Sequence, residues 1–279
     1  MADPVTASAD LLQVATRLGR ISYRQAGEGD RVHVLLHGIG SASASWQAQL
    51  DAAQGRSDLR LLAWDAPGYG LSDPVADPQA DTYARHLWAW LDALQIHEPV
   101  VLVGHSLGAI MAARAAVQHS SRVRRLLLLS PARGYGQAPE AERERIVSAR
   151  LGQLAQLGPE GLARSRAAAM LSARAKPEWV EQVRRNMAAI HPAGYTQAVQ
   201  LLAYASLIPD VRKLCDLKLP IAVASGQDDA ITSPQACDEV AAAAGVSRMG
   251  LGPVGHACAI EAARGVMDLI DRHSTEPAL

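Results

Sequence analysis

The chain has 279 residues, 49% of them hydrophobic, and a formal net charge of −1 at pH 7. This length and apolar content suffice for one large domain or two small ones, while the balanced charge argues against nucleic acid or an anionic membrane as a partner. Three scattered cysteines exclude a disulfide framework and a zinc site. The first ten residues carry two acids and no signal-peptide pattern, and no apolar run is long enough to cross a bilayer, so we expect a cytoplasmic protein.

Short apolar runs alternate with helical patterns along most of the chain. Such runs are typical of strands buried on both faces of a parallel sheet. The predicted strands cover residues 11–18, 20–25, 32–36, 59–64, 100–103, 123–129, 219–225 and 246–251, with Gly19 as the first turn. The predicted helices cover residues 79–95, 109–116, 233–244 and 256–272. This α/β alternation implies a mostly parallel sheet with its ligand site beyond the carboxyl ends of the strands.

The alternation breaks over residues 133–213, where Ala, Arg, Glu and Leu form helical patterns without strand signals. Proline is favoured in the first turn of a helix, and four prolines mark such starts here: Pro139, Pro159, Pro177 and Pro192. We therefore expect three or four helices inserted between two core strands. The predicted domains are a core of residues 1–132 and 214–279 and a helical cap of residues 133–213 over the sheet edge.

The pentapeptide Gly104-His105-Ser106-Leu107-Gly108 joins the strand at 100–103 to the helix at 109–116. Its glycines lack a Cβ, so the chain can turn sharply and neighbouring elements can approach closely. A serine in this G-x-S-x-G turn is held over the sheet at the start of a helix. Ser106 is therefore the candidate nucleophile.

A serine hydroxyl needs a base, and the base needs an orienting acid. His256 follows the last predicted strand and so falls at the same sheet edge, whereas His105 is expected to pack structurally because adjacent side chains diverge at a sharp turn. The loop after the strand at 219–225 supplies Asp228 and Asp229, and the residues alone leave both open as the acid. Along the chain, the candidates stand in the order Ser, Asp, His, an order that recurs in one class of serine hydrolases.

A tetrahedral intermediate needs two N–H donors for its oxyanion. The backbone of Leu107 is one candidate, and the turn after the strand at 32–36 supplies the other through Ile39, with Gly40 as the alternative. Gly38 and Gly40 are also candidates for substrate contact. Arg133 follows the strand that leads into the cap and is a candidate for pairing with a substrate carboxylate, its alternative being a solvated loop arginine.

Together these motifs resemble the α/β-hydrolase fold superfamily. They are H-G-I-G at 37–40 with Trp46 downstream, D-x-P-G-Y-G-x-S at 65–72, G-H-S-L-G at 104–108, G-x-x-D at 226–229 and G-H at 255–256. The resemblance covers nearly all of the chain outside 133–213. It implies an eight-stranded, mostly parallel sheet with helices on both faces, a helical cap that forms the pocket, and neither a cofactor nor a metal. It also selects Asp229 over Asp228 as the acid and makes Asp65 a structural residue.

The G-x-S-x-G turn at 104–108 is the nucleophile elbow of this fold. Its serine excludes the reaction of the haloalkane dehalogenases and epoxide hydrolases of this fold, which use an aspartate as the nucleophile at that position. We expect a cofactor-independent hydrolase of a small carboxylic ester or lactone that works through an acyl-enzyme. The chain also resembles carbon–carbon bond hydrolases of aromatic catabolism and enol-lactonases, but Ala257 and Ala109 stand where those have Trp and Gly. An acyltransferase and a non-catalytic binding protein on the same fold remain alternatives. The expected partner is a small molecule, and a homodimer is left open.

Overall fold

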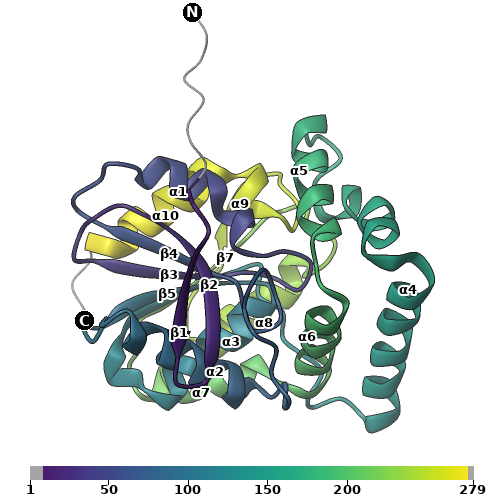
Figure 1. Ribbon diagram of the computed structural model, residues 1–279, viewed down its shortest axis with the longest axis horizontal. Coiled ribbons are helices and arrows are strands. Elements are labelled where there is room, and N and C mark those ends of the chain that lie inside the picture. The colour runs from purple at the N-terminus through teal and green to yellow at the C-terminus, as the bar shows by residue number, and fades with distance from the viewer. Residues whose placement is uncertain (1–8, 276–279) are drawn as a thin grey trace, which may run out of the picture.

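The computed structural model describes residues 9–275, which form an eight-stranded sheet flanked by helices (Figure 1). The strands are β1 (Leu12–Thr16), β2 (Gly19–Ala26), β3 (Val32–Leu36), β4 (Arg60–Trp64), β5 (Val100–His105), β6 (Val123–Leu129), β7 (Ile221–Ser225) and β8 (Met249–Gly250). Their order in the sheet is β1-β2-β4-β3-β5-β6-β7-β8. Strand β2 runs antiparallel to β1 and β4, and the other neighbours are parallel. The mostly parallel α/β sheet expected from the sequence is confirmed.

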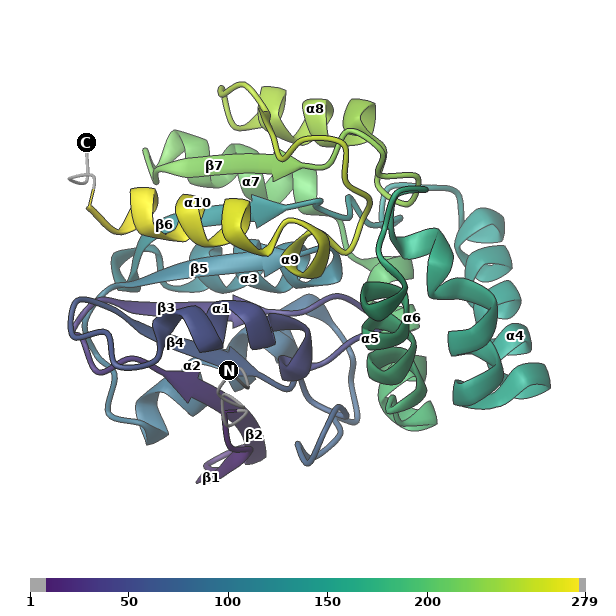
Figure 2. The ribbon, with the colours of Figure 1, turned by 90° about the horizontal axis from the view of Figure 1, so that it is seen from above.

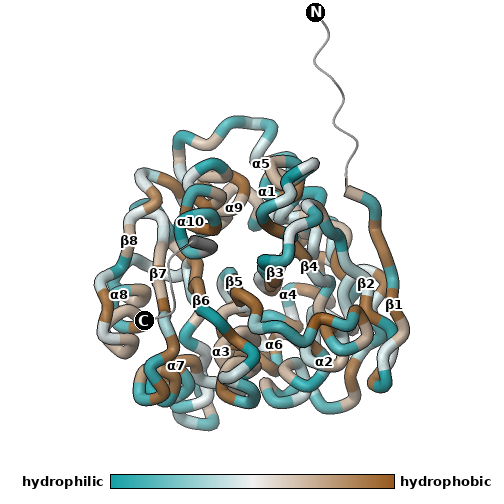
Figure 3. Tube along the Cα trace, turned by 90° about the vertical axis from the view of Figure 1, so that its left-hand side faces the viewer, coloured by the Kyte–Doolittle hydropathy of each residue, from teal (hydrophilic) through white to brown (hydrophobic). Residues whose placement is uncertain are grey.

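The helices form two layers on the sheet and a third group at its end. They are α1 (Gln47–Ala53), α2 (Ala80–Ala93), α3 (Leu107–Gln118), α4 (Glu140–Arg166), α5 (Pro177–Ala188), α6 (Pro192–Tyr204), α7 (Leu207–Asp216), α8 (Pro234–Ala243), α9 (Cys258–Glu261) and α10 (Ala263–Thr275). Seen along the strands, α1, α9 and α10 lie on one side of the sheet and α2, α3 and α7 on the other (Figure 3). Helices α4, α5 and α6 lie beyond the carboxyl ends of the strands (Figure 2).

Strand β6 shows why the central strands are continuously apolar. Leu126 and Leu128 belong to the core that also contains side chains of α2 and α3, whereas Leu127 and Leu129 pack with side chains of α1 and α10. Successive side chains of a strand point to opposite faces, so where helices cover both faces, as over Leu126–Leu129, successive positions are apolar. The short apolar runs in the sequence therefore predict these strands well.

Proline and glycine set the helix starts at the end of the sheet. Helices α5 and α6 begin at Pro177 and Pro192, and Pro139 caps α4. Within α4, Gly158 leaves the helical conformation (φ 62°, ψ 175°) directly before Pro159, so the chain turns and a second helical segment begins. Among the described residues, no helix has both the length and the apolar character of a membrane span.

Several element bounds differ from the prediction. Gly19 begins β2 instead of forming the turn, and the edge strand β8 is only two residues long. The predicted helix at 256–272 is two helices, because Ala262 departs from helical geometry (φ −116°, ψ 40°). Helix α7 runs past the predicted boundary at 213. Its apolar face, Leu207, Val211 and Leu214, is buried in the main core.

Candidate active site

Ser106 occupies a strained position between β5 and α3. Its backbone (φ 53°, ψ −116°) lies in a region that L-residues rarely adopt, at a cost of about 1–3 kcal/mol. The glycines on either side permit this turn. A Cβ on Gly104 would lie 2.6 Å from the carbonyl oxygen of Gly108, and a Cβ on Gly108 would lie 2.2 Å from that of Leu36. The turn therefore places the serine just beyond the strand, at the first turn of α3.

Asp229 and His256 form a buried pair. Asp229 Oδ2 lies 3.0 Å from His256 Nδ1, and both side chains are almost completely buried. The second carboxylate oxygen accepts hydrogen bonds from the backbone N–H groups of Ile231 and Thr232, each at 2.9 Å. Burial raises the pKa of Asp229, but the hydrogen bonds and the charge of His256 outweigh it and hold that pKa at about 2. Asp229 is thus ionised at neutral pH and accepts the Nδ1–H of His256.

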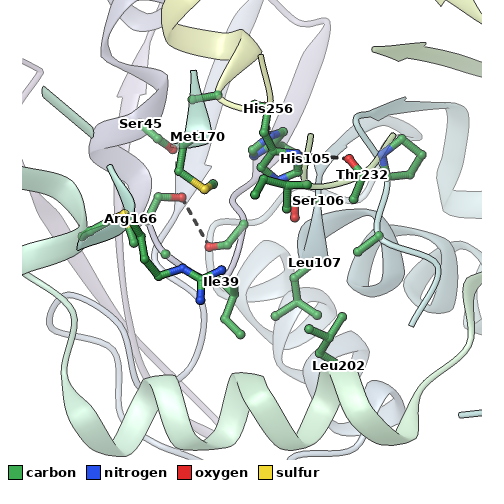
Figure 4. Close-up of a pocket in the computed structure, with 18 of the residues that line it drawn as sticks. Ile39, Ser45, His105, Ser106, Leu107, Arg166, Met170, Leu202, Thr232 and His256 are labelled. Carbon is green, nitrogen blue, oxygen red and sulfur yellow. Dashed lines mark hydrogen bonds between the residues drawn. The ribbon is translucent and has the colours of Figure 1, made fainter. Parts of the chain in front are cut away.

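The structure brings Ser106 and His256 to the same cavity (Figure 4). Asp229 lies behind His256 and is 3% exposed, whereas the neighbouring Asp228 side chain is exposed to solvent. Of the two carboxylates left open by the sequence, only Asp229 contacts the imidazole among the described residues.

Thr232 takes part in this pair, although no sequence motif indicated it. Its hydroxyl oxygen lies 2.9 Å from Asp229 Oδ2, 3.1 Å from His256 Nδ1 and 3.0 Å from the carbonyl oxygen of Ser130. A hydroxyl both donates and accepts, so Thr232 can donate to the carboxylate or the carbonyl while it accepts from the imidazole. This side chain fixes the position of both partners.

His105 holds the backbone of His256. Its Nε2–H donates to the His256 carbonyl oxygen at 2.8 Å, and the two ring centroids are 4.9 Å apart. Burial, together with the charge of His256, lowers the pKa of His105 to about 3. His105 is therefore neutral at physiological pH and supports the loop that carries His256.

The residues predicted to form the oxyanion site all line the cavity: Gly38, Ile39, Gly40 and Leu107. Within the described part of the chain, the backbone N–H groups of Ile39 and Leu107 donate to no other group. The Tyr69 hydroxyl donates to the Ile39 carbonyl oxygen at 2.7 Å, which fixes the turn after β3. Both N–H groups are thus available to a bound oxyanion.

Asp65 does not line the cavity that contains Ser106 and His256. One of its oxygens accepts from the Ser43 backbone N–H at 2.8 Å and the other from the Ser22 hydroxyl at 2.6 Å. The carboxylate is 1% exposed. It ties the end of β4 to β2 and to the turn before α1, which is the structural role expected for it.

The cavity has a volume of about 180 Å³, which suits a small ligand. Arg133 lines it, but its guanidinium donates to Glu239, and both side chains are substantially exposed. Its charge is already paired, so its predicted contact with a substrate carboxylate stays a prediction. Among residues 9–275, no group of three His, Cys, Asp or Glu side chains is arranged to hold a metal.

Glu261 connects the chain that follows α4, at Ser172, to the loop that carries His256. Its carboxylate accepts from the backbone N–H of Ser172 at 3.0 Å, from the Ser172 hydroxyl, and from the backbone N–H of Gly255 at 2.8 Å. Alongside, the Ala257 N–H donates to the Met170 carbonyl oxygen at 2.7 Å. These bonds fasten the residues after α4 to residues 255–257.

Glu261→Ala should therefore lower the free energy of unfolding by about 2–4 kcal/mol, because two buried N–H groups lose their acceptor. Urea denaturation measures the change. Glu178, an exposed glutamate at the start of α5, provides the control, since Glu178→Ala should stay within about 0.5 kcal/mol of the wild type. Equal stability of the two variants would contradict the role of Glu261.

Residues 34–263 match the family model described as the alpha/beta hydrolase fold. The chain belongs to the α/β-hydrolase fold family. The family expected from the sequence motifs is thereby confirmed.

Two curated hydrolases are similar to this chain in sequence. The chain is 28% identical over 214 residues to the (E)-2-((N-methylformamido)methylene)succinate hydrolase of Acinetobacter baylyi, covering 74% of this chain and 75% of that one. It is 38% identical over 116 residues to the 2-hydroxymuconate semialdehyde hydrolase of Pseudomonas sp. strain CF600, covering 40% of each. The chain spans less than half the length of the curated relatives that it matches at 33 to 38% identity.

Among solved structures, an esterase of Thermogutta terrifontis matches with a TM-score of 0.82 at 22% sequence identity, over 95% of this chain and 97% of that one. At this identity the similarity establishes the shared fold.

Proposed function

We propose that this α/β-hydrolase is a cofactor-independent serine hydrolase of a small carboxylic ester or lactone, with Ser106 as nucleophile, His256 as base and Asp229 as orienting acid. One arrangement supports the proposal. An ionised, buried Asp229 binds His256 Nδ1, and that imidazole shares a small cavity with a serine held at a strained elbow.

In the proposed reaction, Ser106 Oγ attacks the carbonyl carbon of the substrate while His256 Nε2 takes the hydroxyl proton. Asp229 keeps the Nδ1–H in place and stabilises the imidazolium that forms. The backbone N–H groups of Leu107 and Ile39 bind the oxyanion. His256 then gives its proton to the leaving oxygen, an acyl-enzyme remains, and water activated by the same histidine releases the acid and restores the serine.

We further propose that, within the predicted cap of residues 133–213, helices α4, α5 and α6 cover the site, whereas α7 at its end packs with the core of residues 1–132 and 214–279. Helices α4 and α5 supply Arg166, Val183 and Met187 to the wall of the cavity that also contains Ser106. A wall built from these helices limits the substrate to a small molecule and keeps bulk water from the acyl-enzyme.

Hydrolysis of a carbon–carbon bond is the second candidate function. It is favoured by the 38% identity to a relative named 2-hydroxymuconate semialdehyde hydrolase. Turnover of ring-fission dienoates together with inertness toward simple esters would select this alternative.

Hydrolysis of p-nitrophenyl esters from C2 to C12 tests the proposal. The small cavity predicts the highest kcat/KM at C2 to C4 and a steep fall for longer acyl chains. The release of p-nitrophenol measures it. A flat dependence on chain length, or no turnover at any length, would contradict a small-ester hydrolase.

The charges of Asp229 and His105 should not shape the pH profile of the reaction above pH 4. The pKa of Asp229 is about 2 and that of His105 about 3, so neither group changes its charge above pH 4. A protonated imidazole cannot accept the Ser106 proton, so an imidazole base predicts a loss of kcat/KM on the acid side, by about tenfold per pH unit on that limb. Measurements with p-nitrophenyl acetate from pH 5 to 8 test this, and a flat profile would remove His256 as the base.

A further inference from the structure

The side chains that line the cavity include arginines but no acidic residue. The arginines are Arg133, Arg150 and Arg166. Much of the remaining wall is apolar: Ile39, Leu107, Met170, Val183, Met187, Leu202, Ile231 and Ile260. A guanidinium facing such a wall loses hydration and gains most from an anion placed against it.

Two of these arginines have no acidic partner. Arg133 pairs with Glu239, whereas within the described part of the chain the guanidinium of Arg166 donates only to the neutral Gln153 Oε1, at 3.2 Å. Arg150 has neither a hydrogen bond nor an ion pair within residues 9–275. Figure 4 shows the Arg166 guanidinium directed toward Ile39 and the part of the cavity that contains Ser106.

The break in α4 brings these groups together. Arg166 and Gln153 are 13 residues apart, which corresponds to about 20 Å along a straight helix, yet their side chains are hydrogen-bonded. The turn at Gly158 therefore folds the second segment of α4 back along the first, so that Arg150 and Arg166 both reach the cavity.

An amide donor completes this wall. Asn186 on α5 also lines the cavity, and its Nδ2 is buried without a hydrogen-bond acceptor. A buried donor without a partner is costly unless a ligand satisfies it. Among the described residues, the cavity is thus lined by two guanidinium groups that have no carboxylate partner and by one amide N–H that has no acceptor.

We propose that Arg166, Arg150 and Asn186 form a carboxylate-binding subsite and that the natural substrate is an ester or lactone bearing a carboxylate away from the scissile carbonyl. The inference rests on the proposed hydrolase function. A guanidinium binds a carboxylate through two parallel hydrogen bonds, so the subsite would both bind the substrate and orient its carbonyl toward Ser106.

Two matched pairs of esters test the subsite. Monoethyl adipate and ethyl hexanoate differ by a carboxylate on the acyl side, and 4-acetoxybenzoate and its methyl ester differ by one on the alcohol side. In at least one pair, the carboxylate ester should have a kcat/KM about 10- to 100-fold above that of its neutral partner. Arg166→Met should lower that ratio about tenfold or more, and Arg166→Lys should retain part of it.

Arg164 provides the control, because it lies on the same helix segment, is exposed and pairs with Glu160. Arg164→Met should leave the ratio and the basal activity unchanged. Preference for the neutral ester in both pairs, with turnover that still depends on Ser106, would overturn the subsite and leave the hydrolase intact.

Binding of adipate and 4-hydroxybenzoate, measured by calorimetry, tests the subsite independently of turnover. At least one should bind the wild type, and Arg166→Met should weaken that binding about tenfold or more. Absence of ester turnover would refute the hydrolase alone, whereas binding that does not respond to Arg166→Met, or no binding, would refute the subsite.

Discussion

Ser106→Ala should lower kcat/KM for any accepted ester by about 10⁴-fold or more while the fold persists. The substitution removes the only atom that forms the acyl bond in the proposed reaction. It leaves the hydrogen bond from the residue 106 backbone N–H to the Leu129 carbonyl and the packing of the elbow in place. The comparison of p-nitrophenyl acetate turnover with the far-ultraviolet circular dichroism of the same sample separates loss of chemistry from loss of fold.

Ser165 on α4 supplies the matched control, since its hydroxyl bonds only to the Leu162 carbonyl oxygen. Ser165→Ala should retain wild-type turnover. A Ser106→Ala variant with a rate close to that of the wild type would remove Ser106 as the nucleophile.

Asp229→Asn should have the next largest effect, a loss of about 10³- to 10⁴-fold in kcat. An amide carries no charge to stabilise the imidazolium, and its NH₂ group can donate to His256 Nδ1. Donation there would place the imidazole proton on Nε2, the atom that must accept the Ser106 proton. Steady-state kinetics on p-nitrophenyl acetate measure the loss.

Asp228→Asn is the control, because that side chain is exposed next to the buried Asp229. We expect its kcat to stay within about twofold of the wild type. The reverse ranking of the two variants would reassign the acid to Asp228.

Much of the fold could be predicted because strands covered on both faces carry runs of successive apolar residues. The same patterns placed the elbow, His256 and the Asp228-Asp229 pair at strand ends, where a parallel sheet gathers its ligand site. Helix starts near Pro177 and Pro192 followed from the fixed backbone angle of proline. Helix α1 was not predicted, because its seven residues bury a glutamine, Gln49, among apolar neighbours.

The supporting contacts could not be predicted because tertiary packing creates them. Thr232 reaches Asp229 and His256 only through the loop geometry after β7. Arg166 meets Gln153 only because α4 folds back at Gly158. In the sequence alone, nothing distinguishes Thr232 or Arg166 from a polar residue that a loop or helix exposes to solvent.

Labelling with a fluorophosphonate tests the central claim most directly, because this probe reacts with an activated serine whatever the natural substrate is. Intact-protein mass spectrometry should show one adduct per chain, and peptide mapping should place it on Ser106. Asp229→Asn should slow the labelling strongly, and Ser106→Ala should abolish it. Labelling of another residue, or ester turnover by a protein whose Ser106 stays unmodified, would contradict the account.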